Sequence, residues 1–272
     1  MKALRHLAAV GDWRARAVLR RNLRVFMRNW RTALLPPAFE PIVFFLAFGI
    51  GLDRHVGGIS YGSQTLDYAT YVAPGLLAYS AWGTPFYEGL YSAYVRMFYQ
   101  KTWDGILATQ VELHHLLWGE ILWAGARGFV NLCIVACVLA GFHALGFVQL
   151  QLQWLPLLPF IGAVAGWVFA AFGLIFTAIV PSIDHMNYPV FLIGIPLSLV
   201  SNTYFPVRPE TAWLRWLMEL NPVYQLAETF RGALVTGSFD QHAWRLLVLC
   251  GIYLAGLFLL AEHLLKKRVL GS

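Results

Sequence analysis

Long apolar segments without charged residues constrain this sequence more than any other feature. No charged residue occurs in residues 154–183. A helix needs about 20 mostly apolar residues to cross a hydrocarbon core about 30 Å thick, because each residue rises about 1.5 Å. This segment is long enough to do so, and we predict that the chain is a membrane protein.

Six segments of the sequence meet this requirement of length and composition. They are residues 32–52, 68–91, 116–142, 154–180, 188–205 and 243–265. Pro36, Pro37, Glu40 and Pro41 interrupt the first of them, which is the least regular. Of the whole chain, 58% is hydrophobic and 12% is charged, and that charged share is about half of the share in a soluble domain. The predicted fold is an all-α membrane protein with six transmembrane helices.

The basic residues indicate how these helices are oriented. Residues 1–31 contain nine Lys or Arg against a single acid, Asp12, which is typical of the cytoplasmic side. An even number of spans returns the C-terminus to that side, where Lys266, Lys267 and Arg268 lie. The net charge of +6 therefore reflects orientation in a membrane, and we expect contact with membrane lipids and no binding of nucleic acid. The expected parts are an amphipathic interface helix at residues 1–31, a transmembrane domain at 32–265 and a cytoplasmic tail at 266–272.

Residues 12–31 are predicted to form an amphipathic helix at the inner membrane surface. Apolar residues recur in it at spacings of three and four, and basic residues do the same beside them. The apolar set is Leu19, Leu23, Phe26, Met27 and Trp30, and the basic set is Arg20, Arg24, Arg28 and Arg31. The arginines of such a helix lie among lipid phosphates. Two interpretations stay open: the helix only anchors the chain, or it also contacts a cytoplasmic partner.

The loop after the second span, at about residues 100–110, is expected on the cytoplasmic side. Thr102 is predicted to cap a short helix, in which Asp104 is favourable in the first turn. The residues that this helix would bury on one side are Trp103, Ile106 and Leu107. A short helix with an exposed aromatic residue suits a groove on a partner protein. The alternative is a loop that packs under its own bundle.

Four ionisable residues fall inside the predicted spans: Glu40, Glu88, Glu120 and Arg127. A charge at the centre of a membrane helix costs about 2.5–3.5 kcal/mol on insertion scales, so such residues face the bundle interior or a cavity. Counted from the cytoplasmic loop, Glu88 and Arg127 lie at similar depths on consecutive antiparallel helices. We predict that these two form a structural ion pair. Direct contact with a substrate is the alternative.

Aromatic residues make up 15% of the chain and are frequent along the second span. Trp and Tyr belong at membrane interfaces by default, but several of these residues lie deeper. Tyr79, Trp82, Phe86 and Tyr87 are therefore candidates for a path that carries sugar rings or acyl chains. An interfacial role is the alternative.

The segment before the last span, at about residues 206–242, is the longest on the predicted outer side. Its second half, residues 221–235, is apolar enough to return partly into the membrane. We predict a re-entrant segment there.

Catalytic motifs that would indicate an ATPase or a zinc enzyme are missing from the sequence. It has no Gly-x-x-x-x-Gly-Lys-Ser/Thr phosphate loop and no His-Glu-x-x-His motif. We expect no catalytic residue, no metal and no cofactor in this chain, so any ATP hydrolysis must occur on another chain. A secondary carrier or channel stays the alternative, although the sequence has no convincing internal repeat.

Several short motifs follow one another along nearly the whole chain. They are Arg20-Arg21-Asn22, Glu40-Pro41, Phe48-Gly49-Ile50-Gly51-Leu52, Ala73-Pro74-Gly75, Lys101-Thr102-Trp103, Gly119-Glu120-Ile121-Leu122-Trp123-Ala124, Pro181-Ser182-Ile183-Asp184 and Tyr204-Phe205-Pro206-Val207. Each motif is weak alone, but their order and spacing together are fairly specific. The chain resembles the ABC type-2 permeases, which export lipids, glycolipids, polysaccharides and drugs, and it is most similar to their NodJ-like branch.

This resemblance implies a bacterial inner-membrane exporter in which two permease copies join two cytosolic ABC ATPase subunits. ATP and Mg²⁺ would bind to the ATPase subunits, and an amphipathic lipid-, glycolipid- or oligosaccharide-linked substrate would pass between the permeases. The NodJ branch is associated with export of lipo-chitooligosaccharides, but the branch alone does not fix the substrate.

The resemblance also assigns a role to the cytoplasmic segments. It implies that residues 102–109 form the coupling helix that sits on the ATPase. The residues expected at this contact are Lys101, Thr102, Trp103, Asp104, Ile106, Leu107, Asp184, Arg20, Arg24 and Arg28. Asn202 and Thr203 depart from the family pattern, which has a small residue, typically Gly, before the aromatic-Pro pair. The resemblance therefore does not assign an outer gate, the closure of the path on the outer side, to residues of this chain.

Overall fold

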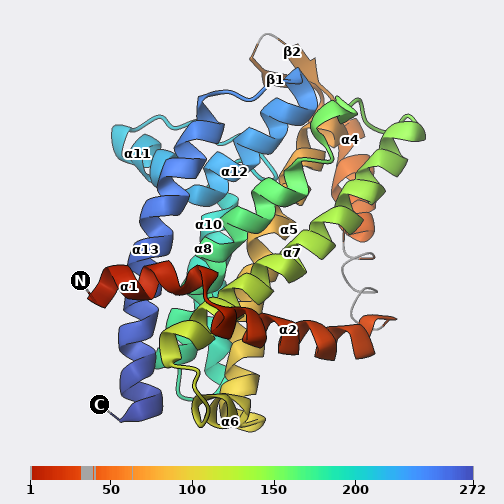
Figure 1. Cartoon of the computed structure of the whole chain (residues 1–272). Coiled ribbons are helices and arrows are strands. Elements are labelled where there is room, and N and C mark those ends of the chain that lie inside the picture. The colour runs from red at the N-terminus through yellow and green to blue at the C-terminus, as the bar shows by residue number, and fades with distance from the viewer. Residues whose placement is uncertain (1, 32–38, 40, 63, 272) are drawn as a thin grey trace.

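The computed structural model describes residues 2–31, 39, 41–62 and 64–271 (Figure 1). Its regular structure is helical apart from one short hairpin, so the all-α prediction is confirmed. Glu40 and residues 32–38 of the predicted first span lie outside the described residues.

Three helices in the described part of the chain are long and apolar enough to cross a membrane. They are α7 (Leu113–Ala144), α8 (Leu158–Ile179) and α13 (Gln241–Leu270). These helices correspond to the third, fourth and sixth predicted spans. Each begins and ends within about five residues of the predicted bounds.

The other predicted spans have more complex backbones. In the second, α5 (Tyr68–Tyr87) continues through the π-helical turns η3 (Glu88–Ser92) and η4 (Val95–Tyr99). The helical backbone therefore passes the predicted end at residue 91 by eight residues. The fifth is divided among α9 (Asn187–Pro189), η7 (Val190–Gly194) and α10 (Ile195–Leu199). The described part of the first contains η2 (Phe45–Ile50) and α4 (Gly51–Val56).

The predicted amphipathic helix is present as α2 (Trp13–Arg28), after α1 (Lys2–Ala8) and η1 (Ala9–Gly11). Asp12 caps α2, because its Oδ1 accepts a hydrogen bond from the Arg14 backbone N–H at 2.9 Å. That bond holds the pKa of the Asp12 carboxyl below its usual value. In Figure 1 α2 crosses α7. A Cβ at Gly119 of α7 would lie 2.4 Å from the Val18 Cβ, so the two helices are in close contact.

The centre of the bundle is α8, which packs against α5, α7 and α13. Small residues let it approach the extension of α5 closely. A Cβ at Gly89 would lie 2.3 Å from the Ala170 carbonyl oxygen, and one at Gly173 would lie 2.5 Å from the Phe86 carbonyl oxygen. The two backbones thus touch without side chains between them.

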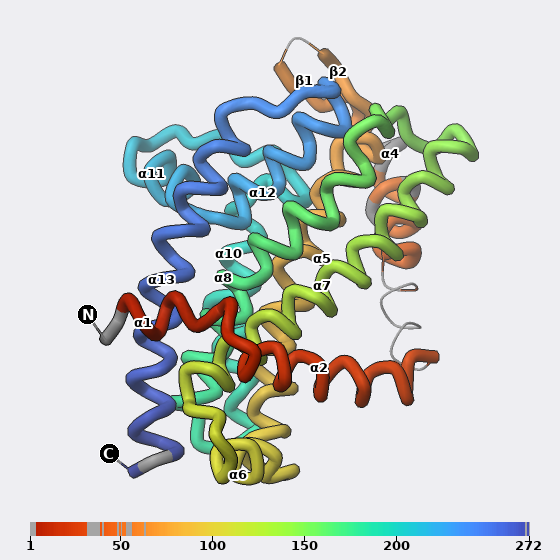
Figure 2. The backbone as a smooth tube through the Cα atoms, in the orientation of Figure 1, coloured from red at the N-terminus to blue at the C-terminus, as the bar shows by residue number. Residues whose placement is uncertain are grey.

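The end of the molecule opposite to α6 (Thr102–Leu107) holds a hairpin and several short helices (Figure 2). In the hairpin, β1 (Ile59–Tyr61) pairs antiparallel with β2 (Gln64–Leu66). The short helical elements between the long helices are η5 (Leu152–Trp154), α11 (Ala212–Leu220), α12 (Pro222–Arg231) and η8 (Gly232–Thr236). The predicted re-entrant segment is formed by α12 and η8, and α12 packs against α5 and α13. Its depth in a membrane stays a prediction.

We expect Gly89→Ala and Gly173→Ala to destabilise the bundle, because each new Cβ must displace the facing backbone. Overpacking of this kind costs about 1–3 kcal/mol. Thermal unfolding of the purified chain in mild detergent measures the effect. Gly251→Ala in α13 is the matched control, since a Cβ there meets nothing within 4 Å. Unchanged unfolding temperatures for both test variants would contradict the close approach of the two helices.

Candidate functional site

A cluster of buried charged side chains lies where α2, the extension of α5, α6 and α7 meet. We call it the inner cluster; its members are Asn22, Glu88, Arg96, Trp103, Glu120, Trp123 and Arg127. The side chains of Glu88 and Glu120 are only 2% exposed, and that of Arg96 is 12% exposed. Charged groups at such depth need partners, because an unpaired buried charge is costly.

Arg96 bridges the two glutamates of this cluster. Its Nη1 lies 2.7 Å from Glu88 Oε1, its Nε donates to Glu120 Oε1 at 3.2 Å, and its Nη2 binds the other Glu120 oxygen. The planar guanidinium fits this two-point contact with a carboxylate. Arg127 binds the second oxygen of Glu88, which confirms the predicted Glu88–Arg127 pair. Arg96 lies beyond the predicted span, and its spacing of eight residues from Glu88 on a continued helix is the signal that would have found it.

Neutral donors complete the inner cluster. Trp123 Nε1 donates to Glu88 at 2.8 Å, and Trp103 Nε1 donates to Glu120 at 3.2 Å. Asn22 of α2 donates to Glu120 at 3.4 Å. Two arginines thus balance two glutamates, and further carboxylate lone pairs accept N–H donors from three elements.

Thr102 lies differently from the prediction for α6, and Trp103 does so only in part. The predicted burial of Trp103 is confirmed, because this side chain is fully buried, whereas the exposed aromatic residue expected to fit a partner groove is wrong for Trp103. Its indole N–H is held by Glu120, and this draws the ring into the bundle. Thr102 is the first residue of α6 and not its cap, because its Oγ1 donates to the Arg96 carbonyl oxygen at 2.9 Å. The cap position belongs to Lys101, which has a φ of +51°.

The surface that α6 presents to its surroundings is polar. Lys101, Asp104 and Gly105 are exposed, whereas Ile106 and Leu107 are half-buried. Lys101 Nζ lies 4.0 Å from Asp104 Oδ2, and such an exposed pair adds little stability. Lys101 Nζ also lies 5.3 Å from the ring centre of Phe98, so its contacts stay within the surface of this turn. The exposed side chains of Lys101 and Asp104 are accessible to a contact outside the chain. That they form such a contact stays a prediction.

The other residues predicted at a partner contact are exposed on α2 and on η6 (Ile183–Met186). They are Arg20, Arg24, Arg28 and Asp184. The η6 segment is tied to the extension of α5, because Tyr94 Oη donates to the Pro181 carbonyl oxygen at 3.0 Å. The structure therefore brings α6 and η6 together on one helical extension, while their role at a partner stays a prediction.

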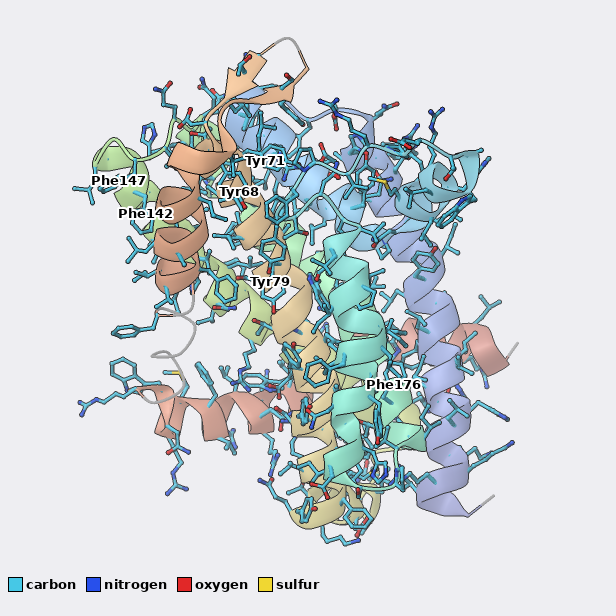
Figure 3. The ribbon with its side chains drawn as sticks, turned by 180° about the vertical axis from the view of Figure 1, so that it is seen from behind. Tyr68, Tyr71, Tyr79, Phe142, Phe147 and Phe176 are labelled. Carbon is cyan, nitrogen blue, oxygen red and sulfur yellow. The ribbon has the colours of Figure 1, made fainter. Side chains whose placement is uncertain are left out.

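The aromatic residues proposed to line a path pack α5 against its neighbours. Phe86 is fully buried, and its ring centroid lies 5.7 Å from that of Phe172 in α8. Trp82 is also buried, whereas Tyr79 and Tyr87 are half-buried. Figure 3 shows Tyr79 midway along α5. A path along these side chains stays a prediction.

A second buried ion pair lies toward the end of the molecule opposite to α6, and sequence reasoning does not single it out. Arg231 is fully buried, its Nη1 lies 2.5 Å from Glu228 Oε1, and its guanidinium lies 4.0 Å from the ring centre of Tyr71. Tyr61 Oη donates to Glu228 at 3.2 Å, and Asn202 Nδ2 donates to it at 3.1 Å. Burial, with the nearby Glu228 carboxylate, raises the pKa of Tyr61 and keeps its hydroxyl protonated. These five residues, the outer cluster, join β1, α5, α12 and the segment after α10.

Asn202 combines a glycine-like backbone with a side chain that the outer cluster uses. Its φ is +53°, a region that Asn occupies more readily than most residues. Its carbonyl oxygen accepts from Arg231 at 2.6 Å, and its Oδ1 accepts from the Val207 backbone N–H at 2.7 Å. The next residue, Thr203, lies so close to α5 that a Cβ at Gly75 would be 1.9 Å from its carbonyl oxygen. The departure from the family pattern thus keeps the turn and adds hydrogen bonds.

A Gly-x-Ser-x-Gly pattern occurs in the sequence, but its serine does not lie at the turn that a catalytic nucleophile needs. Residues 58–62 read Gly-Ile-Ser-Tyr-Gly and match Gly-x-Ser-x-Gly. A nucleophile elbow needs that serine at a sharp turn between a strand and a helix. Here Ser60 lies within β1, where it is paired with Thr65 of β2, so the pattern carries no nucleophile role in this fold.

Comparison with known proteins matches most of the chain. Residues 14–235 match the family described as ABC-2 type transporter. Nodulation protein J of Rhizobium leguminosarum bv. trifolii is 29% identical over 256 residues, which cover 93% of each chain. Nodulation protein J of Rhizobium meliloti is 25% identical over 260 residues and 95% of each chain. The inner membrane transport permease YadH of Escherichia coli is 24% identical over 230 residues, or 79% of this chain and 80% of its own.

Removal of Arg96 is expected to destabilise the protein more than removal of Arg127. Arg96→Met leaves two glutamates short of a partner, whereas Arg127→Met affects one glutamate and a side chain that is 36% exposed. Breaking a buried ion pair costs about 3–5 kcal/mol, and R96M should show a loss of this size in thermal unfolding. Arg20→Met, at an exposed position of α2, is the control. Equal losses for R96M and R127M would argue against the bridging role of Arg96.

Proposed function

The chain belongs to the ABC-2 type transporter family, and from this premise we propose that it is the permease subunit of an ATP-driven exporter. The proposed topology has six spans in a bacterial inner membrane, with both termini in the cytoplasm. The three long apolar helices support the spans, and the basic residues at both ends of the sequence support the orientation. The segment of α12 and η8 then lies on the outer side.

The energy for transport is proposed to come from separate subunits. Permeases of this family generally work with a cytosolic ATPase. Two copies of that ATPase would bind ATP and Mg²⁺, and two copies of this chain would enclose the path. No catalytic residue, metal or cofactor is assigned to the chain itself.

The observation that carries this proposal is the connection of α6 to the inner cluster. Pressure on the exposed face of α6 moves Trp103 against Glu120, because the two are hydrogen-bonded. Glu120 is bound to Arg96, and Arg96 is bound to Glu88. The displacement therefore reaches α7, the extension of α5 and, through Asn22, α2. A contiguous network of this kind is a physical route for coupling between sites.

The proposed cargo is an amphipathic lipid-, glycolipid- or oligosaccharide-linked molecule that leaves the cytoplasm or the inner leaflet. The likeness to the two Nodulation J proteins supports this class of cargo. The aromatic residues of α5 support it too, since their ring faces suit sugar rings and acyl chains. Because Trp82 and Phe86 are buried, they would line a path only after α5 moves away from α8.

Gly105→Trp is expected to abolish binding of the ATPase without affecting the permease fold. Gly105 is exposed on α6, and a Cβ there meets nothing within 4 Å, so the added indole blocks only an external contact. The measurement is co-purification of the tagged chain from its native membrane in mild detergent, followed by an ATPase assay. Gly141→Trp is the matched control, because Gly141 lies near the C-terminal end of α7, away from α6, and a Cβ there also meets nothing within 4 Å.

The co-purification tests both the presence of an ATPase partner and the role of α6 in binding it. A soluble ATPase that accompanies the wild-type and Gly141→Trp chains, and is lost with Gly105→Trp, would support the coupling role of α6. Recovery of the wild-type chain without any ATPase would contradict the proposal and favour a secondary carrier or channel.

A further inference from the structure

A cavity of about 330 Å³, lined by both charged and apolar residues, lies between α2, the extension of α5 and α7. Among the described residues, those that line it include Arg21, Arg96 and Arg127, and one acidic residue, Glu88. Glu88 is already paired with Arg96 and Arg127. Arg96 is also paired with Glu120, so the two glutamates balance Arg96 and Arg127. Arg21 on α2 supplies the additional positive charge, which no carboxylate of the inner cluster binds in the described contacts.

An apolar groove of about 470 Å³ adjoins this cavity. It runs between α7 and α8, with Ala126 and Val130 on one side and Ala163 and Val164 on the other, and Leu23 of α2 also lines it. Val164 is 43% exposed, so the groove is open along the side of the bundle. An apolar groove that opens on the side of a membrane protein meets acyl chains.

The two spaces are continuous, because Phe26, Trp123 and Arg127 line both of them. Arg127 stands at the junction. One Nη of Arg127 binds Glu88, while 36% of the side chain is exposed, and a guanidinium has five N–H donors. A charged cavity thus lies directly beside an apolar groove. A phospholipid has the matching parts, a charged headgroup joined to apolar acyl chains.

We propose that the cavity and the groove together hold one anionic phospholipid of the inner leaflet. Its phosphate faces Arg21 and Arg127, and one acyl chain lies between α7 and α8. The proposal rests on the cytoplasmic placement of α2 given under Proposed function. A lipid in this position touches both α2 and α7, so it holds the interfacial helix against the bundle beside the inner cluster.

The test is the amount of phosphatidylglycerol that stays bound to the purified full-length chain after exchange into phosphatidylcholine nanodiscs, measured by native mass spectrometry. Arg21→Ala removes a charge-assisted contact, and we expect about tenfold less retained phosphatidylglycerol. Arg24→Ala is the matched control, since it removes the same charge from the same helix at a position that does not line the cavity. The control should retain the wild-type amount.

The apolar half of the site is tested separately. Ala126→Phe and Val164→Trp fill the groove from opposite sides, and both should lower the retained phosphatidylglycerol. Cys137→Phe is the control, because Cys137 is exposed on the same helix as Ala126 and does not line the groove. Two independent filling variants keep the test valid if one of them fails to fold.

Several outcomes would overturn the proposal. An equal loss in Arg21→Ala and Arg24→Ala would show a general attraction of α2 for anionic membranes and no defined site. Unchanged lipid retention in both filling variants would exclude the groove, and a change in the mass of the permease assembly in these variants would show that a second copy of the chain occupies it. The readout needs no ATPase, so failure of the proposed ATP-driven function would leave this result interpretable.

Discussion

The arrangement of the half of this protein that contains α6 depends on the pairing of Arg96 with Glu88 and Glu120. These side chains lie in surroundings of low dielectric, where an isolated charge is far less stable than in water. Arg96 contacts both carboxylates, and this fixes the extension of α5 beside α7. Trp103 can reach Glu120 only because that geometry is held. The position of α6 is therefore a consequence of charge pairing within the bundle.

The same helical backbone takes part in both buried clusters. It runs from Tyr68 to Tyr99, and it carries Tyr71 in the outer cluster and Arg96 in the inner one. A tilt of this helix as a rigid body changes the contacts at both of its ends. The close approaches at Gly89 and Gly173 allow such a movement only if α8 follows or separates. The structure thus connects α6 with the opposite end of the molecule through one element.

Sequence reasoning predicted those features that depend on local pattern. The lengths of α2, α7, α8 and α13 follow from apolar runs and helical spacing, so they were predictable. The Glu88–Arg127 pair was also predictable, because the two residues lie at similar depths on consecutive antiparallel helices. The burial of Trp103 on one side of α6 was predicted, but its hydrogen bond to Glu120 was not, because Glu120 is seventeen positions away and on another helix. The continuation of α5 to Arg96 was missed because the π-helical turns carry polar residues that resemble the end of a span. The ion pair of α12 was hidden in an apolar segment, although a spacing of three residues between opposite charges was a usable signal.

Stability alone does not explain why charged residues occupy these interiors. Well-packed apolar residues of similar volume often replace a buried ion pair without loss of stability. A network of hydrogen bonds differs from apolar packing in how it rearranges. Each donor needs an acceptor, so donors exchange partners between distinct arrangements and do not shift continuously. The cavity beside Glu88, Arg96 and Arg127 leaves space in which such an exchange of partners is sterically possible. If α6 is displaced as proposed above, the inner cluster is the part of the bundle in which contacts would change, because Trp103 of α6 is hydrogen-bonded to Glu120.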